Sequence, residues 1–392
     1  MRPISRRTFL AASAGSVAGL KWPYLARAAA GKRDTLLREA ALMRGIPGIQ
    51  ACVVDRSGDT WLGAEGWADV ANQRPMTPET IQNIASISKT VTATAVMQLV
   101  ERRAVALDGD ASAYLPFPLK HPQFADAAIT VRHLLAHRSG IRDSPAYDAS
   151  YACGDPTELL EEWIRSLLDP DGTRFHPRQN FIPRAPGERY SYSNVGYGVL
   201  GLIVEFVSGQ AFDAYCKTNI FEPLSMDATG WYLRDVDVSN HAVPYAFDEN
   251  GNAADEKLIV GASARGYQPL CLYSFPNYSD GLVRTSASDF AKFARAYLNG
   301  GGTILRPETT KAMWVDQNGS ATQNLQGLCW SGRRLDSGGV RWGHDGGDPG
   351  VTTIFALEPQ RGVGAAVFTN GPGHTVLNHV LESLLSDAYR GI

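Results

Sequence analysis

The chain has few cysteines for its length, five in 392 residues, and no two of them have a C-x-x-C spacing. Zinc sites and dithiol redox sites need closely spaced thiols, so the sequence indicates no metal and no other cofactor. We predict that the cysteines are buried free thiols, with a disulfide as the alternative. They are Cys52, Cys153, Cys216, Cys271 and Cys329.

Dense runs of Lys and Arg are missing after Lys32. The chain has 37 basic and 40 acidic residues, a formal charge of −3. Residues 1–30 contain five bases and no acid, so without them 37 − 5 = 32 bases face 40 acids and the charge is −8. Binding to nucleic acid through charge needs a basic face, which excludes that class of partner.

No apolar run near the N-terminus is long enough to span a bilayer, because AASAGSVAGL is too short. It follows a basic segment, MRPISRRTFL, with the pair Arg6 and Arg7, and it precedes the small residues of ARAAAG. We predict that residues 1–30 are a twin-arginine signal peptide, cleaved near Ala28 or Ala30. The mature protein is then periplasmic or secreted, with no stable membrane anchor.

Several catalytic signatures are also absent. There is no G-x-S-x-G elbow of an α/β-hydrolase, no K-T-G and no dinucleotide motif. His133 and His137 have the i, i+4 spacing of a zinc pair, but HLLAH lacks the glutamate that a zinc protease uses as its base. We therefore expect both histidines in the core and no metal site.

What is present is a set of strand-like runs at both ends of the chain, among them GIQACVVD and TWLGAEG early and GVTTIFALEP and GVGAAVFTNG late. Helical patterns begin at Asp34, a possible N-cap, and close the chain. We predict an α/β (α+β) fold with one antiparallel sheet, built from about 31–80 and 320–392 and flanked by terminal helices. The part from about 81 to 319 is mainly helical.

Ser86 and Lys89, in ASISKTV, form the only S-x-x-K of the chain, where a helical pattern begins. This spacing puts a hydroxyl and an amine on one helix face, near N–H groups that favour developing negative charge. A serine needs a base to become a nucleophile, and burial can lower the pKa of a lysine toward that task. The pattern indicates covalent acyl transfer, with an ordinary helix cap at Ser86 as the alternative.

Tyr192 and Asn194 belong to a Y-S-N in PGERYSYSNVGYGVLG, at the start of another helical pattern. A phenol at this place can relay a proton. A second Y-x-N, from Tyr297 to Asn299, has the pattern of a helix end. Because only the first lies in a Pro-Gly turn, it is the candidate.

His344, Asp345 and Gly346 form the H-D-G of RWGHDGGDPG. The pattern is that of a late strand, and its glycines let a substrate approach the backbone. The alternative is a hydrogen-bonded structural histidine followed by turns.

In this order and broad spacing, S-I-S-K, Y-S-N and H-D-G resemble the serine β-lactamase and penicillin-binding protein superfamily, most closely its class C type. The resemblance extends to LDGDASAYLP, ITVRHLLAHRSGI and DGLVRTSASDFAKFARAYLNGG, and covers nearly all of residues 45–370. It implies that Ser86 is the acylated nucleophile, that Lys89 accepts its proton and that Tyr192 shuttles protons.

The resemblance also implies roles for four further positions. Asn194 would orient the substrate and the lysine, and Gly346 would belong to the substrate-binding strand. The backbone N–H groups of Ser86 and Gly347 would form the oxyanion hole. His344 would hold the place that other members give to Lys.

Three enzyme activities fit this resemblance: a D-amino-acid peptidase or related amidohydrolase, a carboxylic esterase, and a β-lactamase. The H-x-G in place of K-T-G favours the first, on family analogy. A protein of another class, a penicillin-binding sensor that is acylated and never turns over, is the alternative to an enzyme. The expected partner is a small molecule or a short peptide.

Asp345 stands where family members that bind a substrate carboxylate commonly have Thr or Ser. Two like charges about 4 Å apart repel by roughly 4 kcal/mol at an effective dielectric near 20, so we expect Asp345 to disfavour carboxylate substrates. The alternative is that Asp345 pairs with Arg341 or His344. The long loops at 143–189 and 233–280 are expected to surround the cleft, without a named ligand.

Overall fold

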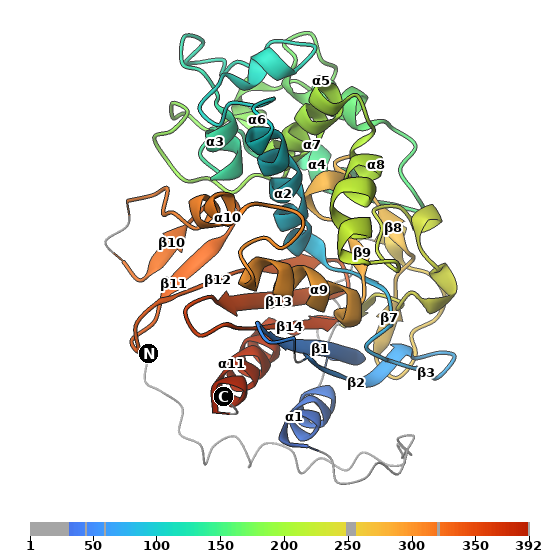
Figure 1. The fold of residues 1–392 in the computed structure, drawn as a ribbon. Helices are drawn as coiled ribbons and strands as arrows, with labels where there is room; N and C mark the ends of the chain where they lie inside the picture. The colour runs from blue at the N-terminus through green and yellow to red at the C-terminus, as the bar shows by residue number, and fades with distance from the viewer. Residues whose placement is uncertain (1–30, 44, 59, 248–255, 320–321, 391–392) are drawn as a thin grey trace.

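The computed structural model describes residues 31–390 except 44, 59, 248–255 and 320–321. The expected signal peptide, residues 1–30, lies outside the described residues. Figure 1 shows a sheet built from the two ends of the chain, with a mainly helical part stacked above it. This arrangement is the one that the sequence predicted.

The main sheet has eight strands in the order β10-β11-β12-β13-β14-β1-β2-β3, and the neighbouring strands are antiparallel. The strands from the two chain ends meet where β1 pairs with β14. Their bounds are β1 Gly48–Asp55, β2 Thr60–Asp69, β3 Arg74–Pro75, β10 Asn324–Gln326, β11 Ser331–Arg334, β12 Val340–Asp348, β13 Val351–Glu358 and β14 Val363–Thr369.

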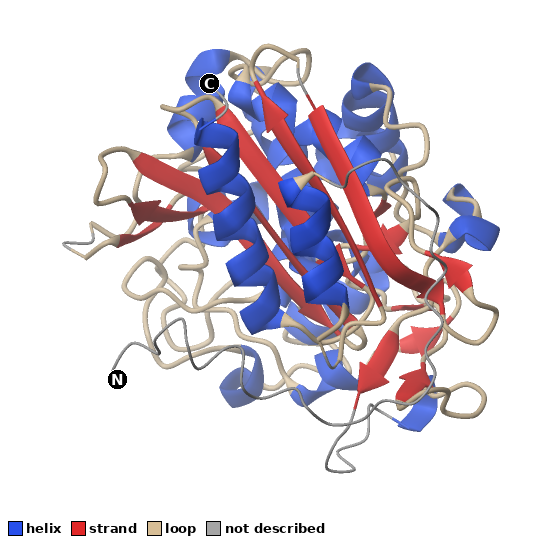
Figure 2. Ribbon diagram, turned by 90° about the horizontal axis from the view of Figure 1, so that it is seen from below, coloured by secondary structure: helices blue, strands red, loops and turns tan. Residues whose placement is uncertain are grey.

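Two helices, α1 (Lys32–Ala41) and α11 (His374–Arg390), lie side by side across one face of the sheet, as Figure 2 shows. Their buried residues, such as Leu37 and Leu381, form one apolar cluster with residues of β1, β13 and β14. The N-cap of α1 is Gly31 and not Asp34, which lies within the first turn of the helix. The Asp34 carboxylate accepts a hydrogen bond from the Gly31 N–H (3.1 Å).

The other face of the sheet is covered by α9 (Ala287–Leu298), which packs on β1 and β14. Phe290 on α9 makes edge contacts with Phe355 and Phe368 of the sheet, at 5.0 and 5.3 Å between ring centroids. Within the predicted helical part, about 81–319, α9 thus packs on the sheet.

The helical part is organised around α2 (Ser88–Glu101) and α7 (Asn194–Ser208), which pack on each other in the main core. The surrounding helices are α3 Val131–Leu135, α4 Pro145–Ala149, α5 Leu160–Leu168, α6 Pro177–Asn180, α8 Phe212–Cys216 and α10 Pro307–Met313. In the described chain no single helix is long and apolar enough to cross a membrane; α7 together with Phe212–Leu224, a bent pair, passes that test by length and composition only.

The described chain also contains three two-stranded ribbons. They pair β4 (Gln82–Asn83) with β9 (Arg284–Thr285), β5 (Ala152–Cys153) with β8 (Tyr273–Ser274), and β6 (Tyr245–Phe247) with β7 (Tyr267–Pro269).

The prediction of free thiols holds for three cysteines and is wrong for two. Cys52, Cys216 and Cys329 are buried and free, whereas Cys153 and Cys271 form a disulfide across 118 residues. The pairing of β5 with β8 brings these two together, so the alternative left open by the sequence applies here.

Candidate active site

Ser86 lies in the 3-10 turn Ala85–Ile87 that leads into α2, and it is half-buried. The preceding residue, Ala85, has a φ of 48°, a left-handed conformation that is strained for a residue with a side chain. Its N–H donates to the side-chain oxygen of Asn83 (2.7 Å). The N–H of Ser86 itself donates to no atom of the described residues, so it is available to a ligand.

Lys89 is fully buried one turn after Ser86, and its ammonium donates to Ser86 Oγ at 2.9 Å. It also donates to the backbone oxygen of Asp280 (2.8 Å) and lies 3.4 Å from that carboxylate. Burial alone lowers the pKa of Lys89, but the facing groups of Tyr192 and Asp280 outweigh burial and raise the pKa above its ordinary value. The expectation of a lowered lysine pKa is therefore wrong for the ligand-free protein, because Tyr192 and Asp280 together outweigh burial.

Tyr192 completes the contact, since its hydroxyl lies 2.9 Å from Ser86 Oγ. Burial raises the pKa of this phenol, although the nearby Lys89 ammonium works against the shift. Near neutral pH, Ser86 Oγ thus accepts from two protonated neighbours. The ring of Tyr192 stacks on the buried His137.

Asn194, the first residue of α7, lies on the wall of the same cavity as Ser86 but makes no hydrogen bond to Lys89. Its side-chain amide donates to Asp143 at 2.9 Å, and its backbone N–H donates to the same carboxylate at 3.1 Å. Asp143 also accepts from the N–H of Val195 (3.0 Å), so it caps α7. The expected orienting of the lysine by Asn194 is not seen, because Asp143 holds the amide.

His344 lies on β12 with its Nδ1 2.6 Å from the backbone oxygen of Asp345. Burial lowers its pKa to about 4, and the Lys89 charge adds to the effect. The imidazole is therefore neutral at pH 7. Its ring centroid is 6.4 Å from that of Tyr192, so His344 borders the three central groups without bonding to them.

The end of β12 offers a free strand edge beside the nucleophile. β11 pairs with β12 only from Val340 to Gly343, whereas β13 pairs with it as far as Asp348. A Cβ at Gly346 would lie 2.8 Å from the backbone oxygen of Ile84, so only glycine lets this strand approach the Ser86 turn. Gly347, the next residue, lines one cavity with Ser86.

Asp345 is exposed and, within the described chain, its carboxylate makes no hydrogen bond or ion pair. Arg341 instead pairs with Glu358 at 2.7 Å and with Glu382. The alternative that Asp345 pairs with Arg341 is therefore wrong. Asp345 and His344 line a second cleft of about 460 Å³, on the other side of the strand edge.

The cavity next to Ser86 has a volume of about 390 Å³ and an acidic wall that the sequence did not predict. Three of its lining residues are acids, Asp148, Asp280 and Asp348, and none is Lys, Arg or His. Two tyrosines, Tyr147 and Tyr151, line it as well. Both lie in the segment 143–189, which the sequence placed around the cleft, and only that placement pointed to them.

Each inner acid of this wall is bonded to one of the tyrosines. The Tyr147 hydroxyl donates to Asp280 at 2.7 Å, and the Tyr151 hydroxyl donates to Asp348 at 2.8 Å. Burial raises the pKa of Asp280 to about 6 and that of Asp348 to about 7. The wall is therefore partly protonated near neutral pH.

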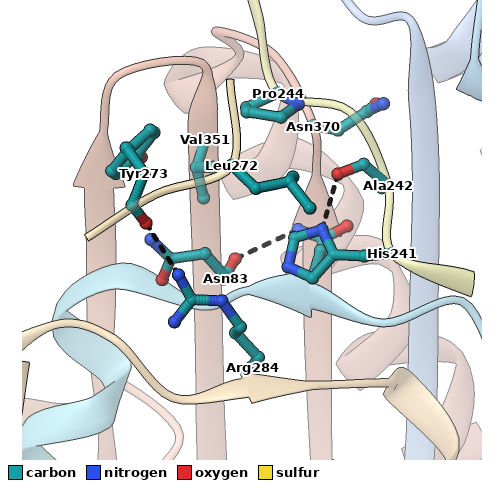
Figure 3. Close-up of a pocket in the computed structure, with 10 residues that line it drawn as sticks. Asn83, His241, Ala242, Pro244, Leu272, Tyr273, Arg284, Val351 and Asn370 are labelled. Atoms are coloured by element: carbon teal, nitrogen blue, oxygen red, sulfur yellow. Dashed lines mark hydrogen bonds between the residues drawn. The ribbon is translucent and has the colours of Figure 1, made fainter. Parts of the chain in front are cut away.

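A tightly packed layer stands behind Asp348. Its carboxylate accepts from the Asn83 amide at 3.3 Å, and Figure 3 shows Asn83 next to Arg284. Arg284 is buried and donates to the backbone oxygen of Tyr273 at 2.7 Å, without an ion pair to any acid of the described residues. Asn83, Arg284 and His241 line another pocket, which Figure 3 shows.

His137 does not act with His133 as a metal pair. His137 is buried against Tyr192, whereas His133 accepts from the Thr130 N–H at 3.3 Å in the cap of α3. In the part of the chain that the structure describes, no group of three His, Cys, Asp or Glu residues is placed to hold a metal ion.

Comparison with known proteins agrees with this geometry. The family model described as Beta-lactamase matches residues 33–388. Unguisins hydrolase ungD' of Aspergillus campestris (strain IBT 28561) is 27% identical over 365 residues, which cover 88% of this chain and 63% of that protein. The chain thus spans less than two thirds of the length of that relative.

Two solved structures share the fold. The octameric penicillin-binding protein homologue from Pyrococcus abyssi has a TM-score of 0.72 at 27% identity, covering 91% of this chain and 77% of that chain. D-amino acid amidase from Ochrobactrum anthropi SV3, complexed with D-phenylalanine, has a TM-score of 0.70 at 21% identity, covering 92% of this chain and 98% of that chain.

Proposed function

Because the chain belongs to the beta-lactamase family, we propose that it is a serine hydrolase that forms an acyl-enzyme at Ser86. One observation carries this proposal: Ser86 Oγ lies 2.9 Å from both Lys89 Nζ and the Tyr192 hydroxyl, on the wall of a cavity. Two groups that can exchange a proton with one hydroxyl are what nucleophilic catalysis by serine requires.

In the proposed reaction, Ser86 Oγ forms a bond to the carbonyl carbon of an amide or ester. Its proton passes to the pair of Lys89 and Tyr192, which must first have lost one proton. The pair then protonates the leaving group, and water later hydrolyses the acyl-enzyme by the reverse path. The free Ser86 N–H supports an oxyanion hole shared with Gly347.

For the substrate, we propose an amide or peptide of a D-amino acid. The acidic cavity and the neutral His344 in place of a lysine support this class over a β-lactamase, whose substrates carry a carboxylate. A carboxylic esterase is the alternative, because the same Ser86 contacts serve an ester equally well. A sensor that is acylated without turnover is the alternative of another class.

Labelling with a fluorophosphonate and hydrolysis of p-nitrophenyl acetate test the proposal. We expect the wild-type protein to be labelled and to hydrolyse the ester steadily, and we expect Ser86→Ala to do neither. General base help is typically worth about 10² to 10⁴, so Tyr192→Phe should lower acylation by orders of magnitude. Normal ester hydrolysis by Ser86→Ala would refute the assignment, and a single burst without turnover would favour the sensor.

We also propose twin-arginine export of the protein to the periplasm or the medium. The Cys153–Cys271 disulfide supports an oxidising compartment, since disulfides rarely persist in the cytosol. Arg6→Lys with Arg7→Lys should trap the precursor inside the cell. Mature protein outside the cytoplasm despite these changes would contradict the proposal.

A further inference from the structure

Of the two inner acids of the wall, Asp280 and Asp348, one is not used by the proposed catalytic groups. Asp280 is the partner of Lys89, which lies 3.4 Å from its carboxylate. Among the described residues, Asp348 accepts from two neutral donors only, the Tyr151 hydroxyl at 2.8 Å and the Asn83 amide at 3.3 Å. No Lys, Arg or His of the described residues lies within ion-pair distance of Asp348.

Tyr151, whose hydroxyl donates to this carboxylate, belongs to a cluster of aromatic rings. The Tyr151 ring lies 6.0 Å from that of Tyr147, 4.5 Å from that of Phe275 and 5.6 Å from that of Tyr273. A partly buried carboxylate is stabilised by a counter-charge, and aromatic faces attract cations. A carboxylate beside an aromatic cluster, on the wall of a cavity and without an ion pair in the described residues, has the chemistry that binds an ammonium group.

The position of Asp348 relates this site to the reaction. It directly follows Gly347, and both residues line the cavity that contains Ser86. An acyl group attached to Ser86 would therefore extend along this wall, within a volume of about 390 Å³. The disulfide between Cys153 and Cys271 joins the two segments that carry Tyr151 and Tyr273, two rings of the aromatic cluster.

We propose that Asp348, within this aromatic wall, binds a free primary amine on the acyl part of the substrate and so selects amino-acid amides, peptides or esters with an unblocked amine. The proposal rests on the acyl-enzyme function of Ser86 proposed above. Asp348 is then a specificity-determining residue, and Asp280 keeps its place beside Lys89.

The ionisation of the wall is consistent with a cationic ligand. Burial raises the pKa of Asp348 to about 7, and the nearby Asp280 charge adds to the shift. A bound ammonium offsets the cost of this buried charge, so its binding releases a proton and strengthens from pH 6 to pH 8. The titratable and charged groups around Asp348 are Tyr147, Tyr151, Tyr273, Asp280, Lys89 and Arg284.

The test compares D-alanine p-nitroanilide with its N-acetyl derivative in wild type and in Asp348→Asn. We expect wild type to prefer the free amine by at least about 10-fold in kcat/KM, because a site that pairs a polar group rejects an analogue without it. In Asp348→Asn this ratio should fall toward one. Asp148→Asn removes an exposed charge from the same wall and is the matched control, which should keep most of the preference.

A measurement on wild type alone keeps the proposal testable if the variant does not fold. Benzylamine should inhibit the hydrolysis of p-nitrophenyl acetate at least about 10-fold more strongly than benzyl alcohol, and more strongly at pH 8 than at pH 6. Equal processing of both anilides together with equal inhibition by both compounds would overturn the amine site and leave the Ser86 function standing. Absence of Ser86-dependent ester hydrolysis would overturn both.

Discussion

The ring of His137 lies flat against the ring of Tyr192, with 4.3 Å between centroids and 26° between planes. His137 also holds the backbone on both sides of that tyrosine, because its backbone oxygen accepts from the Ser191 N–H (2.7 Å) and its Nδ1 from the Ser193 N–H (3.1 Å). Burial and the nearby Lys89 charge keep the pKa of His137 well below its ordinary value, so the ring is neutral. We infer that His137 positions the phenol against Ser86.

Replacing His137 with Asn tests the stacking role of its ring separately from its hydrogen bonds to the backbone. Asn tolerates the φ of 54° at this position and can still accept from the Ser193 N–H, but it has no ring to stack. We expect kcat for p-nitrophenyl acetate to fall by about 10-fold or more with little change in KM, since small misplacements of a catalytic group are costly. His133→Asn, four residues earlier, is the control. Equal kcat values for both variants would contradict a positioning role.

The pairing of Lys89 with Asp280 predicts the pH dependence of acylation. The carboxylate helps to hold the pKa of Lys89 above its ordinary value, so the pair with Tyr192 loses its proton only at alkaline pH, and kcat/KM rises with pH. In Asp280→Asn we expect the rise of kcat/KM, its acid limb, to shift to lower pH by at least about one unit. The reason is that a unit charge 3.4 Å from Lys89 is worth several kcal/mol.

Profiles of kcat/KM for p-nitrophenyl acetate between pH 5 and 10 would show the shift of the limb. This neutral ester avoids any contribution from amine binding. Asp280→Glu keeps the charge, so its acid limb should stay nearer to that of wild type than the limb of Asp280→Asn does. Superimposable profiles for wild type and Asp280→Asn would mean that the Lys89 proton does not control acylation.

The three central residues could be predicted because each belongs to a short motif at the start of a helix. Ser86 with Lys89 and Tyr192 with Asn194 are local patterns, and a helix start places their side chains in a known direction. The glycines around His344 predicted a late strand that a substrate can approach, whereas its free edge is known only from the strand pairing.

The acidic wall could not be predicted, because its parts meet only in space. Asp280 ends a short turn, Tyr147 and Tyr151 lie in and just after the short helix α4, and Asp348 follows H-D-G on β12. No periodic pattern relates such segments. The same limit explains the lysine pKa, which depends on Asp280, and the disulfide, which joins residues 118 positions apart.

Asp348 also predicts how stability depends on pH. Its folded pKa is raised to about 7, whereas an unfolded Asp titrates near 3.9. The folded state favours the neutral form of Asp348. This contribution to stability is fully present below about pH 4 and is lost as the pH rises through about 7. Asp348→Asn should therefore gain in melting temperature relative to wild type between pH 5 and pH 8, by about 2 °C or more.

Thermal melts at these two pH values measure the effect. Asp237→Asn is a control of opposite sign, because a hydrogen bond from Ser239 lowers the pKa of the exposed Asp237. It should not raise the melting temperature at pH 8. A constant difference between wild type and Asp348→Asn at both pH values would show that Asp348 does not titrate in this range.

The last prediction concerns Asp345, whose carboxylate is exposed on the free edge of β12 and has no partner in the described chain. A substrate carboxylate about 4 Å away would be repelled by roughly 4 kcal/mol at an effective dielectric near 20 and by about 1 kcal/mol in water. Because Asp345 is exposed, we expect the lower part of this range, about fivefold to 30-fold in kcat/KM.

Asp345→Thr should therefore raise kcat/KM for nitrocefin and for a D-alanyl-D-alanine peptide, which carry a carboxylate, by at least about fivefold relative to wild type. A D-alanyl anilide and a short-chain ester carry none and serve as the internal controls, because a general effect of the substitution would change all four substrates together. High salt should narrow the difference for the two carboxylate substrates, since an exposed charge is screened. Wild-type activity on the two carboxylate substrates equal to that of Asp345→Thr at low salt would show that this carboxylate does not set the preference.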